Sequence, residues 1–288
     1  MARDIFQNPK SPMIIERLIN FIVKPGDIVM DFFSGSATTA EAVMQLNAKY
    51  TDKKIHFIMV QLPENIDDSI SKADSRAKKT LQNAVKFLDS INKKHTICEI
   101  GKERVRRVGA QIRKDIATSV AVDMMPLTIF NDSTNEDKIN SKVERKLDEL
   151  SNLDIGFRVL KLDSTNMKDV YYNPAEYEIS LFDTLADNIK EDRTPEDLLF
   201  QVMLDLGVLL SSKIEESIIG GKKVFNVADG FLYACFDENV SEDVITEIAK
   251  KQPYYFVMRD SSMASDSVAT NFEQIFATYS PDTVRKVL

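Results

Sequence analysis

The stretch from Asp27 to Thr39 reads Asp-Ile-Val-Met-Asp-Phe-Phe-Ser-Gly-Ser-Ala-Thr-Thr. It begins with a short apolar run, typical of a strand buried on both faces of a parallel sheet, and the run stops at the carboxylate of Asp31. Gly35 permits a tight turn in which the backbone can approach a ligand, and residues 40–46 are predicted to form a helix. This order predicts a nucleotide-binding crevice. The single glycine excludes the dinucleotide pattern, which needs three.

A second strand is predicted at Lys54–Gln61, and it completes a strand-helix-strand unit. Many cofactor-binding folds place a carboxylate at the end of this strand to hold the ribose hydroxyls. Here the position is Gln61, whose amide can still bond a hydroxyl although it lacks charge assistance. Gln61 is therefore the predicted ribose contact.

Several motifs resemble the S-adenosylmethionine-binding region of DNA amino-methyltransferases and, more narrowly, the modification (Mod) subunit of type III restriction-modification systems. The motifs that carry the resemblance are Asn8-Pro9-Lys10, Asp31–Thr39, Val60–Glu64, Lys102–Arg107, residues 156–164, Asn226–Gly230 and residues 259–276. The resemblance extends over essentially the whole chain, and its second half narrows it to type III. It implies S-adenosyl-L-methionine as cofactor, double-stranded DNA as substrate, a restriction (Res) subunit as partner, and a homodimer.

The resemblance also assigns roles before the first strand. Asn8, Pro9 and Lys10 match positions that line the methionine end of the cofactor. As an alternative, Pro9 and Pro12 simply set the entry to a helix whose apolar positions recur at helical spacing up to Ile22.

In the turn, Asp31 is predicted to accept hydrogen bonds from the cofactor ammonium, and such charge-assisted bonds are the stronger ones. Phe32 and Phe33 are expected to wall the site with apolar surface. Close backbone approach and polar donors are expected from Gly35, Ser36 and Thr39.

The resembled family usually has Gly at position 37, where this chain has Ala37. If the backbone there needs a positive φ, alanine costs on the order of 1 kcal/mol and weakens cofactor binding.

Methyl transfer to a base amino group needs a pocket that receives the flipped base. In the resembled enzymes an Asp/Asn-Pro-Pro-Tyr/Phe motif does this work, and in this permuted class it lies upstream of the cofactor motif. The sequence contains no such tetrapeptide. The chain is therefore expected to correspond to the C-terminal half of a Mod subunit without the target-recognition region, to carry no catalytic residue and no metal site, and not to methylate DNA alone.

Two alternative functions stay open at this point. One is a noncatalytic module that dimerises or docks the restriction subunit and binds no cofactor, which Ala37, Gln61 and the missing tetrapeptide favour. The other is a small-molecule methyltransferase, which the type III-like second half disfavours.

Charge is distributed unevenly along the chain. Up to Val120 there are 20 Lys and Arg against 14 Asp and Glu, a balance of +6, and the remainder holds 17 against 31, a balance of -14. A basic half is compatible with a polyanion partner. The basic residues Arg104, Arg106, Arg107, Arg113 and Lys114 are predicted to lie on one helix, either as a phosphate-contacting face or as a solvated one.

We expect an α/β protein with a partial Rossmann-like methyltransferase sheet in residues 1–116 and an α+β C-terminal domain in residues 117–288. The predicted strands and helices of the second half are Phe157–Leu162, Ile214–Ile219, Lys222–Val227, Phe231–Phe236 and Tyr254–Met258 as strands, and helices at Thr194–Gly207, Ser241–Lys250 and Val268–Thr278. Cys98 and Cys235 are expected to be reduced thiols, because they are far apart in the sequence and have no metal-binding spacing. The chain is expected to be cytoplasmic, because its start has no apolar core of signal-peptide length and no apolar run has the length of a membrane helix.

Overall fold

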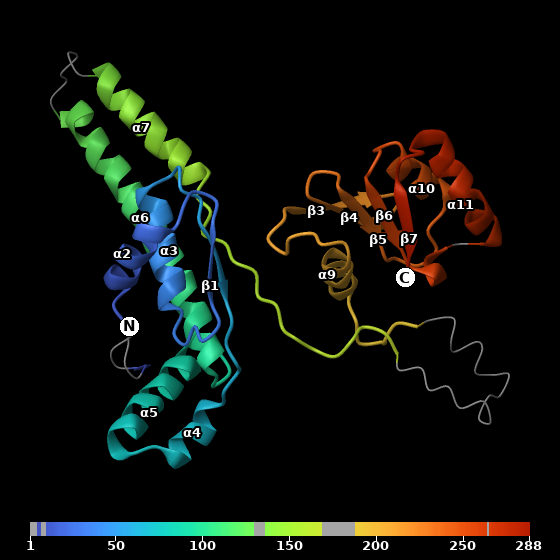
Figure 1. Cartoon of the computed structure of the whole chain (residues 1–288). Coiled ribbons are helices and arrows are strands. Elements are labelled where there is room, and N and C mark those ends of the chain that lie inside the picture. The colour runs from blue at the N-terminus through green and yellow to red at the C-terminus, as the bar shows by residue number, and fades with distance from the viewer. Residues whose placement is uncertain (1–4, 7–9, 130–135, 169–187, 264) are drawn as a thin grey trace. The chain divides into compact units, whose positions relative to one another are not determined.

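The computed structural model describes residues 5–6, 10–129, 136–168, 188–263 and 265–288 (Figure 1). The chain divides into two compact units, Met1–Phe157 and Arg158–Leu288. Each unit has its own hydrophobic core.

The first unit is built on a strand-helix-strand arrangement. Strand β1 (Ile28–Asp31) pairs in parallel with β2 (His56–Met59), and α3 (Thr38–Lys49) connects them. The register sets Asp31 opposite Met59, so the carboxyl ends of both strands meet at one edge. This confirms the predicted parallel pair, and the edge is where ligands bind in open α/β sheets.

Helix α2 (Pro12–Ile22) lies beside α3 (Figure 1). Pro12 stands in the first helical turn, where its missing N–H costs nothing. Ile19 packs with Val43 and Leu46 of α3 in a buried cluster. α2 and α3 thus bury one another on one face of the two-stranded sheet.

Four further helices complete the first unit: α4 (Ile66–Lys72), α5 (Ser75–Ser90), α6 (Ile97–Ile129) and α7 (Glu136–Ser151). The side chains of Asn65 and Asp74 cap α4 and α5 by accepting backbone N–H bonds. Figure 1 shows α7 beside the C-terminal part of α6, and the two helices project together from the rest of the first unit. Helix α6 runs unbroken across position 117, where we had expected the domain boundary, and the two compact units separate at Phe157 instead.

An extended segment after α7 packs back on the first unit. Leu153, Ile155 and Phe157 alternate with exposed residues and contact the cluster around α3 and α6. A Cβ added at Gly109 of α6 would lie 3.0 Å from the Cβ of Ile155, so the glycine permits this close approach. The strand predicted at Phe157–Leu162 is wrong, because these residues are extended but pair with no strand among the described residues.

The second unit is a five-stranded mixed sheet with helices on both faces. Its strands, in spatial order, are β3 (Ile214–Ile219), β4 (Lys222–Val227), β5 (Leu232–Cys235), β6 (Tyr255–Met258) and β7 (Val284–Val287). The first three are antiparallel neighbours, and β5, β6 and β7 are parallel. Figure 1 shows α10 (Glu242–Ala249) and α11 (Asp266–Tyr279), the two crossover helices, side by side.

Alternating side chains of the central strands feed two separate cores. Phe256 and Met258 of β6 pack with α10 and α11, whereas Val257 between them packs with α9 (Pro195–Asp205) on the opposite face. This period of two is what a sheet buried on both faces requires. Seven of the predicted elements of this half are confirmed within two residues at each end: the strands β3, β4, β5 and β6 and the helices α9, α10 and α11.

The structure confirms a mixed α/β protein. Whether the two-stranded sheet of the first unit belongs to a larger Rossmann-like sheet stays a prediction.

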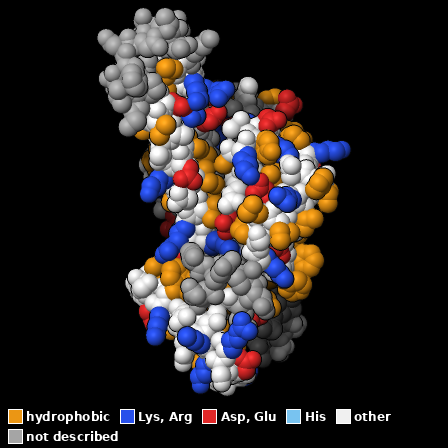
Figure 2. All heavy atoms as spheres, turned by 90° about the vertical axis from the view of Figure 1, so that its left-hand side faces the viewer, with side chains coloured by type: hydrophobic (Ala, Val, Ile, Leu, Met, Phe, Trp, Pro, Cys, Tyr) orange, Lys and Arg blue, Asp and Glu red, His pale blue; other side chains and the backbone are white. Residues whose placement is uncertain are grey.

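No described helix is long and apolar enough to cross a membrane. Figure 2 shows hydrophobic side chains interspersed with Lys and Arg on one side of the molecule.

Candidate functional site

The turn between β1 and α3 has a left-handed backbone at two positions. Gly35 has φ of 49° and Ala37 has φ of 59° and ψ of 39°. The Ala37 N–H donates to the Ser34 carbonyl oxygen at 2.7 Å, which closes the turn just before the first residue of α3. The suspected positive φ at position 37 is therefore present, and a non-glycine residue pays roughly 1–2 kcal/mol for it.

Asp31 ties the two ends of the turn together. Its Oδ2 accepts the Thr39 hydroxyl at 2.7 Å, and its Oδ1 accepts the Phe33 N–H at 3.2 Å. A carboxylate has about four lone-pair positions, so these two bonds leave acceptor capacity for a cationic ligand. Asp31 and Thr39, both predicted site residues, are thus brought into direct contact.

Gln61 reaches the turn from the end of β2. Its Oε1 accepts the Gly35 N–H at 2.7 Å, and its Nε2 donates to the Leu62 carbonyl oxygen at 3.3 Å. The amide nitrogen carries two hydrogens, so one is left for a ligand hydroxyl. The structure therefore brings Gln61 and Gly35 together.

Arg104 of α6 is the residue of this site that sequence reasoning misassigned. Its Nη1 donates to the Ser36 carbonyl oxygen at 3.0 Å, to the Ser36 hydroxyl at 2.7 Å and to the Thr38 hydroxyl at 2.7 Å. Its Nε lies 2.6 Å from Oε2 of Glu41 on α3. Arg104 is buried, so the phosphate-contacting interpretation is wrong for this residue. The available signal was its position four residues after Ile100 on the apolar stripe of the helix.

The neighbouring arginines of α6 lie at the surface, where the phosphate-contacting and the solvated interpretation both stay open. Arg106 and Arg107 are exposed and both pair with Glu103 one turn before them. Such exposed pairs contribute little to stability.

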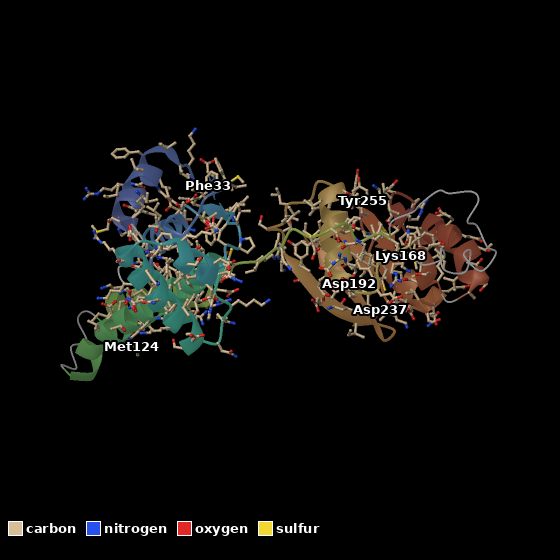
Figure 3. The ribbon with its side chains drawn as sticks, turned by 90° about the horizontal axis from the view of Figure 1, so that it is seen from below. Phe33, Met124, Lys168, Asp192, Asp237 and Tyr255 are labelled. Atoms are coloured by element: carbon tan, nitrogen blue, oxygen red, sulfur yellow. The ribbon has the colours of Figure 1, made fainter. Side chains whose placement is uncertain are left out.

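The aromatic residues of the turn are exposed. Phe32 and Phe33 have 62% and 81% of their surface accessible, and their ring centroids lie 5.3 Å apart. Phe33 lies at the surface of the first unit (Figure 3). A different phenylalanine faces the glycine: a Cβ added at Gly35 would lie 2.9 Å from Cζ of Phe6. Phe6 belongs to the arm before α2 and was not among the site residues predicted from the sequence.

The remaining predicted contacts lie in this arm. Asn8 and Pro9 are outside the described residues, and Lys10 is exposed two residues before the first residue of α2. The structure therefore leaves the predicted role of Asn8-Pro9-Lys10 at the methionine end of a cofactor untested.

Two titratable side chains of the first unit have raised pKa values, and one of them contacts Gln61. The Cys98 thiol, at the start of α6, lies 3.4 Å from the Gln61 carbonyl oxygen, and partial burial raises its pKa. His95 lies between two carboxylates, with Nε2 2.8 Å from Asp89 and Nδ1 2.8 Å from Asp67, and these hydrogen bonds raise the imidazole pKa. Within the described ranges, no group of three or more His, Cys, Asp and Glu side chains could hold a metal ion.

Residues 2–103, which contain the turn, Gln61 and Cys98, match the family model described as DNA methylase (N6_N4_Mtase). The turn and Gln61 therefore lie within a region that is similar to DNA methylases.

Three relatives indicate more narrowly which DNA methylases the chain resembles. The chain is 28% identical over 158 residues to the Mod subunit of the type III restriction-modification enzyme StyLTI of Salmonella typhimurium, covering 53% of this chain and 19% of the relative. It is 27% identical over 139 residues to the EcoPI Mod subunit of Escherichia phage P1, covering 48% of this chain and 21% of the relative. Over 63 residues it is 44% identical to the EcoP15I Mod subunit of Escherichia coli, covering 22% of this chain and 10% of the relative.

The chain is thus similar in sequence to the Mod subunits of type III restriction-modification enzymes, which agrees with the resemblance that its motifs indicated. The matches span about a fifth of the length of the first two relatives and fit a fragment of a Mod subunit.

Proposed function

We propose that this chain supplies the S-adenosyl-L-methionine-binding turn and the C-terminal region of a type III adenine (N6) DNA methyltransferase. The observation that carries the proposal is the turn itself. Asp31 stands at the carboxyl end of a parallel strand, and Gly35 and Ala37 turn the backbone before α3 within the region that matches DNA methylases.

The donor set fits the cofactor. The remaining acceptor capacity of Asp31 suits an ammonium group, and the free N–H of Gln61 suits a ribose hydroxyl. Phe32 and Phe33 offer exposed apolar surface beside the turn, suited to a flat aromatic ring. S-adenosylmethionine supplies the methyl group, and the residues of this chain bind and orient it.

Methyl transfer needs more than this chain contains. None of its nine prolines are adjacent, so the Pro-Pro core of the base-binding tetrapeptide is missing from the sequence. The sheet face opposite α3 also leaves Ile28, Met30 and Ile58 exposed, although parallel sheets are normally covered on both faces. We therefore propose that this chain does not methylate DNA alone and acts with polypeptide that supplies the tetrapeptide and covers this face.

The partners of the proposed enzyme follow from the relatives, which are subunits of restriction-modification enzymes. Double-stranded DNA is the proposed substrate. The second unit, with its separate core, is proposed to mediate dimerisation and contact with the restriction subunit.

A second candidate function is a docking module that binds no cofactor. Three observations favour it: the left-handed Ala37, the use of Gln61 Oε1 by the Gly35 N–H, and Phe6 against Gly35. All three reduce the space or the polar groups that a ligand would use.

Calorimetric titration of the purified chain with S-adenosylmethionine separates the two functions. The proposed enzyme function predicts saturable binding that Asp31→Ala abolishes and that Asp52→Ala, an exposed carboxylate in the turn after α3, leaves unchanged. Absence of binding by the folded chain would favour the docking module. In a parallel methylation assay on DNA, sequence-specific turnover by the chain alone would contradict the proposed need for further polypeptide.

A further inference from the structure

Helix α6 lies directly on the turn that joins β1 to α3. A Cβ added at Gly101 would lie 3.3 Å from the Gly35 carbonyl oxygen and 3.5 Å from the Ala37 Cβ. A larger side chain at position 101 would therefore separate the helix from the turn. Three residues further along, on the same side of the helix, stands Arg104.

Arg104 connects three segments through one guanidinium group. Nη1 bonds both oxygens of Ser36 and the hydroxyl of Thr38, and Nε pairs with Glu41. Glu41 compensates the buried charge, whose burial without a partner would be strongly unfavourable. The other three acceptors all belong to the turn or the first residue of α3.

These bonds surround the backbone position that is least favourable for its residue. Ser36 and Thr38 flank Ala37, whose left-handed conformation an L-residue adopts at a cost. A strained backbone persists only where its surroundings hold it. The two hydroxyls and one carbonyl that Arg104 holds lie immediately before and after the strained residue.

We propose that Arg104 is a positioning residue that, with Glu41, holds the turn 34–38 in the conformation that accepts the cofactor. This inference rests on the proposed cofactor-binding function. It also separates Arg104 from Arg106 and Arg107 of the same arginine-rich stretch, which are exposed and pair with Glu103 of their own helix. Arg104 cannot contact a nucleic-acid phosphate while its guanidinium group is buried against the turn.

The test combines two measurements on the full chain and its variants. The amides of Ser34, Gly35 and Ala37 donate hydrogen bonds to Val60, Gln61 and Ser34, respectively. Their hydrogen exchange reports the turn without any ligand. Calorimetry reports S-adenosylmethionine binding. The variants are Arg104→Gln and Arg104→Lys, and the matched control is Arg107→Gln on the exposed face of the same helix.

In Arg104→Gln we expect exchange of the turn amides to accelerate roughly tenfold or more and cofactor affinity to fall roughly ten- to hundredfold, because several charge-assisted bonds are lost. Amides in the middle of α3 should exchange at their original rate. Arg104→Lys should lie between, because an ammonium retains the charge beside Glu41 but cannot reproduce the guanidinium fork. Arg107→Gln should change neither measurement.

Unchanged turn exchange in a folded Arg104→Gln would overturn the proposal. If that variant does not fold, Arg104→Lys and Thr38→Val carry the test, and turn exchange in both that equals the unsubstituted chain would overturn it equally. If the unsubstituted chain binds no S-adenosylmethionine, the proposed function fails, while the exchange measurement still decides whether Arg104 holds the turn.

Discussion

Replacing Ala37 by glycine should be far less harmful than the same replacement elsewhere in the first unit. Ala37 has φ of 59°, and relief of that conformation gains about 1–2 kcal/mol. Loss of its buried methyl group costs about 0.8 kcal/mol. The greater freedom of the unfolded glycine chain costs about 0.4–1 kcal/mol. These contributions nearly cancel, so Ala37→Gly should lie within about 1 kcal/mol of the original stability.

The matched control is Ala42→Gly in α3. Ala42 is fully buried and helical, so its replacement loses a similar methyl group and about 1 kcal/mol of helix propensity, with no strain to relieve. We expect it to destabilise by about 2 kcal/mol. Native-state hydrogen exchange of the α3 amides measures both variants within the first unit, whatever the second unit does. Equal destabilisation by the two variants would refute the strained description of Ala37.

Three other predictions concern single contacts. The pKa of His95 is raised by hydrogen bonds to Asp89 and Asp67, so its contribution to the stability of α4 and α5 should be full below pH 6.5 and should be lost as the pH rises through its folded pKa. Hydrogen exchange of α4 and α5 measured across this pH range should show the loss. His95→Gln, but not His56→Gln, should remove the pH dependence. Thr194→Ala should lower the free energy of urea unfolding of the second unit by about 1 kcal/mol, because Thr194 and Asp197 form a reciprocal cap of α9. Ser241→Ala, at the N-cap of α10 where the side chain makes no capping hydrogen bond, should lower it less. Equal losses in the two variants would contradict the capping argument. Gly220→Ala should destabilise the second unit more than Gly221→Ala. Both glycines have positive φ, but a Cβ at Gly220 would lie 2.6 Å from Cγ2 of Val244, whereas a Cβ at Gly221 would meet open space. The reverse order of stability in thermal unfolding would refute this prediction.

Local signals in the sequence predicted much of the second unit. Gly220 and Gly221 both adopt positive φ, and the hairpin on either side of them has the predicted bounds. The Thr194 cap was equally visible, because its hydroxyl and the following Pro195 and acids act within one helical turn. Such features depend on residues close together in the chain.

Features that depend on distant partners were missed. The strand β7 is defined by its pairing with β6, which the local sequence did not indicate. The segment from Phe157 to Leu162 has strand-like residues but pairs with no strand in the part of the chain that the structure describes. Helix α6 continues through the expected boundary because α7 packs along it. Local sequence alone does not encode these pairings.

The candidate site also has some features that the local sequence predicted and others that depend on distant residues. Strand, turn and helix around Asp31 followed from apolar runs and one glycine, and Gln61 was located by the end of the second strand. The apolar stripe of α6 indicated that Arg104 is buried, but its partners in the turn depend on how α6 packs against the turn, which no local pattern determines. A charged stretch therefore was interpreted as surface although one of its members is buried.

The central claim is that the turn from Asp31 to Thr39, together with Gln61, binds S-adenosylmethionine. The most direct measurement is hydrogen exchange of the whole chain with and without saturating S-adenosylmethionine. We predict slower exchange in residues 31–39 and around Gln61, with the second unit unchanged. No protection in these segments, or protection confined to other parts of the chain, would contradict the claim.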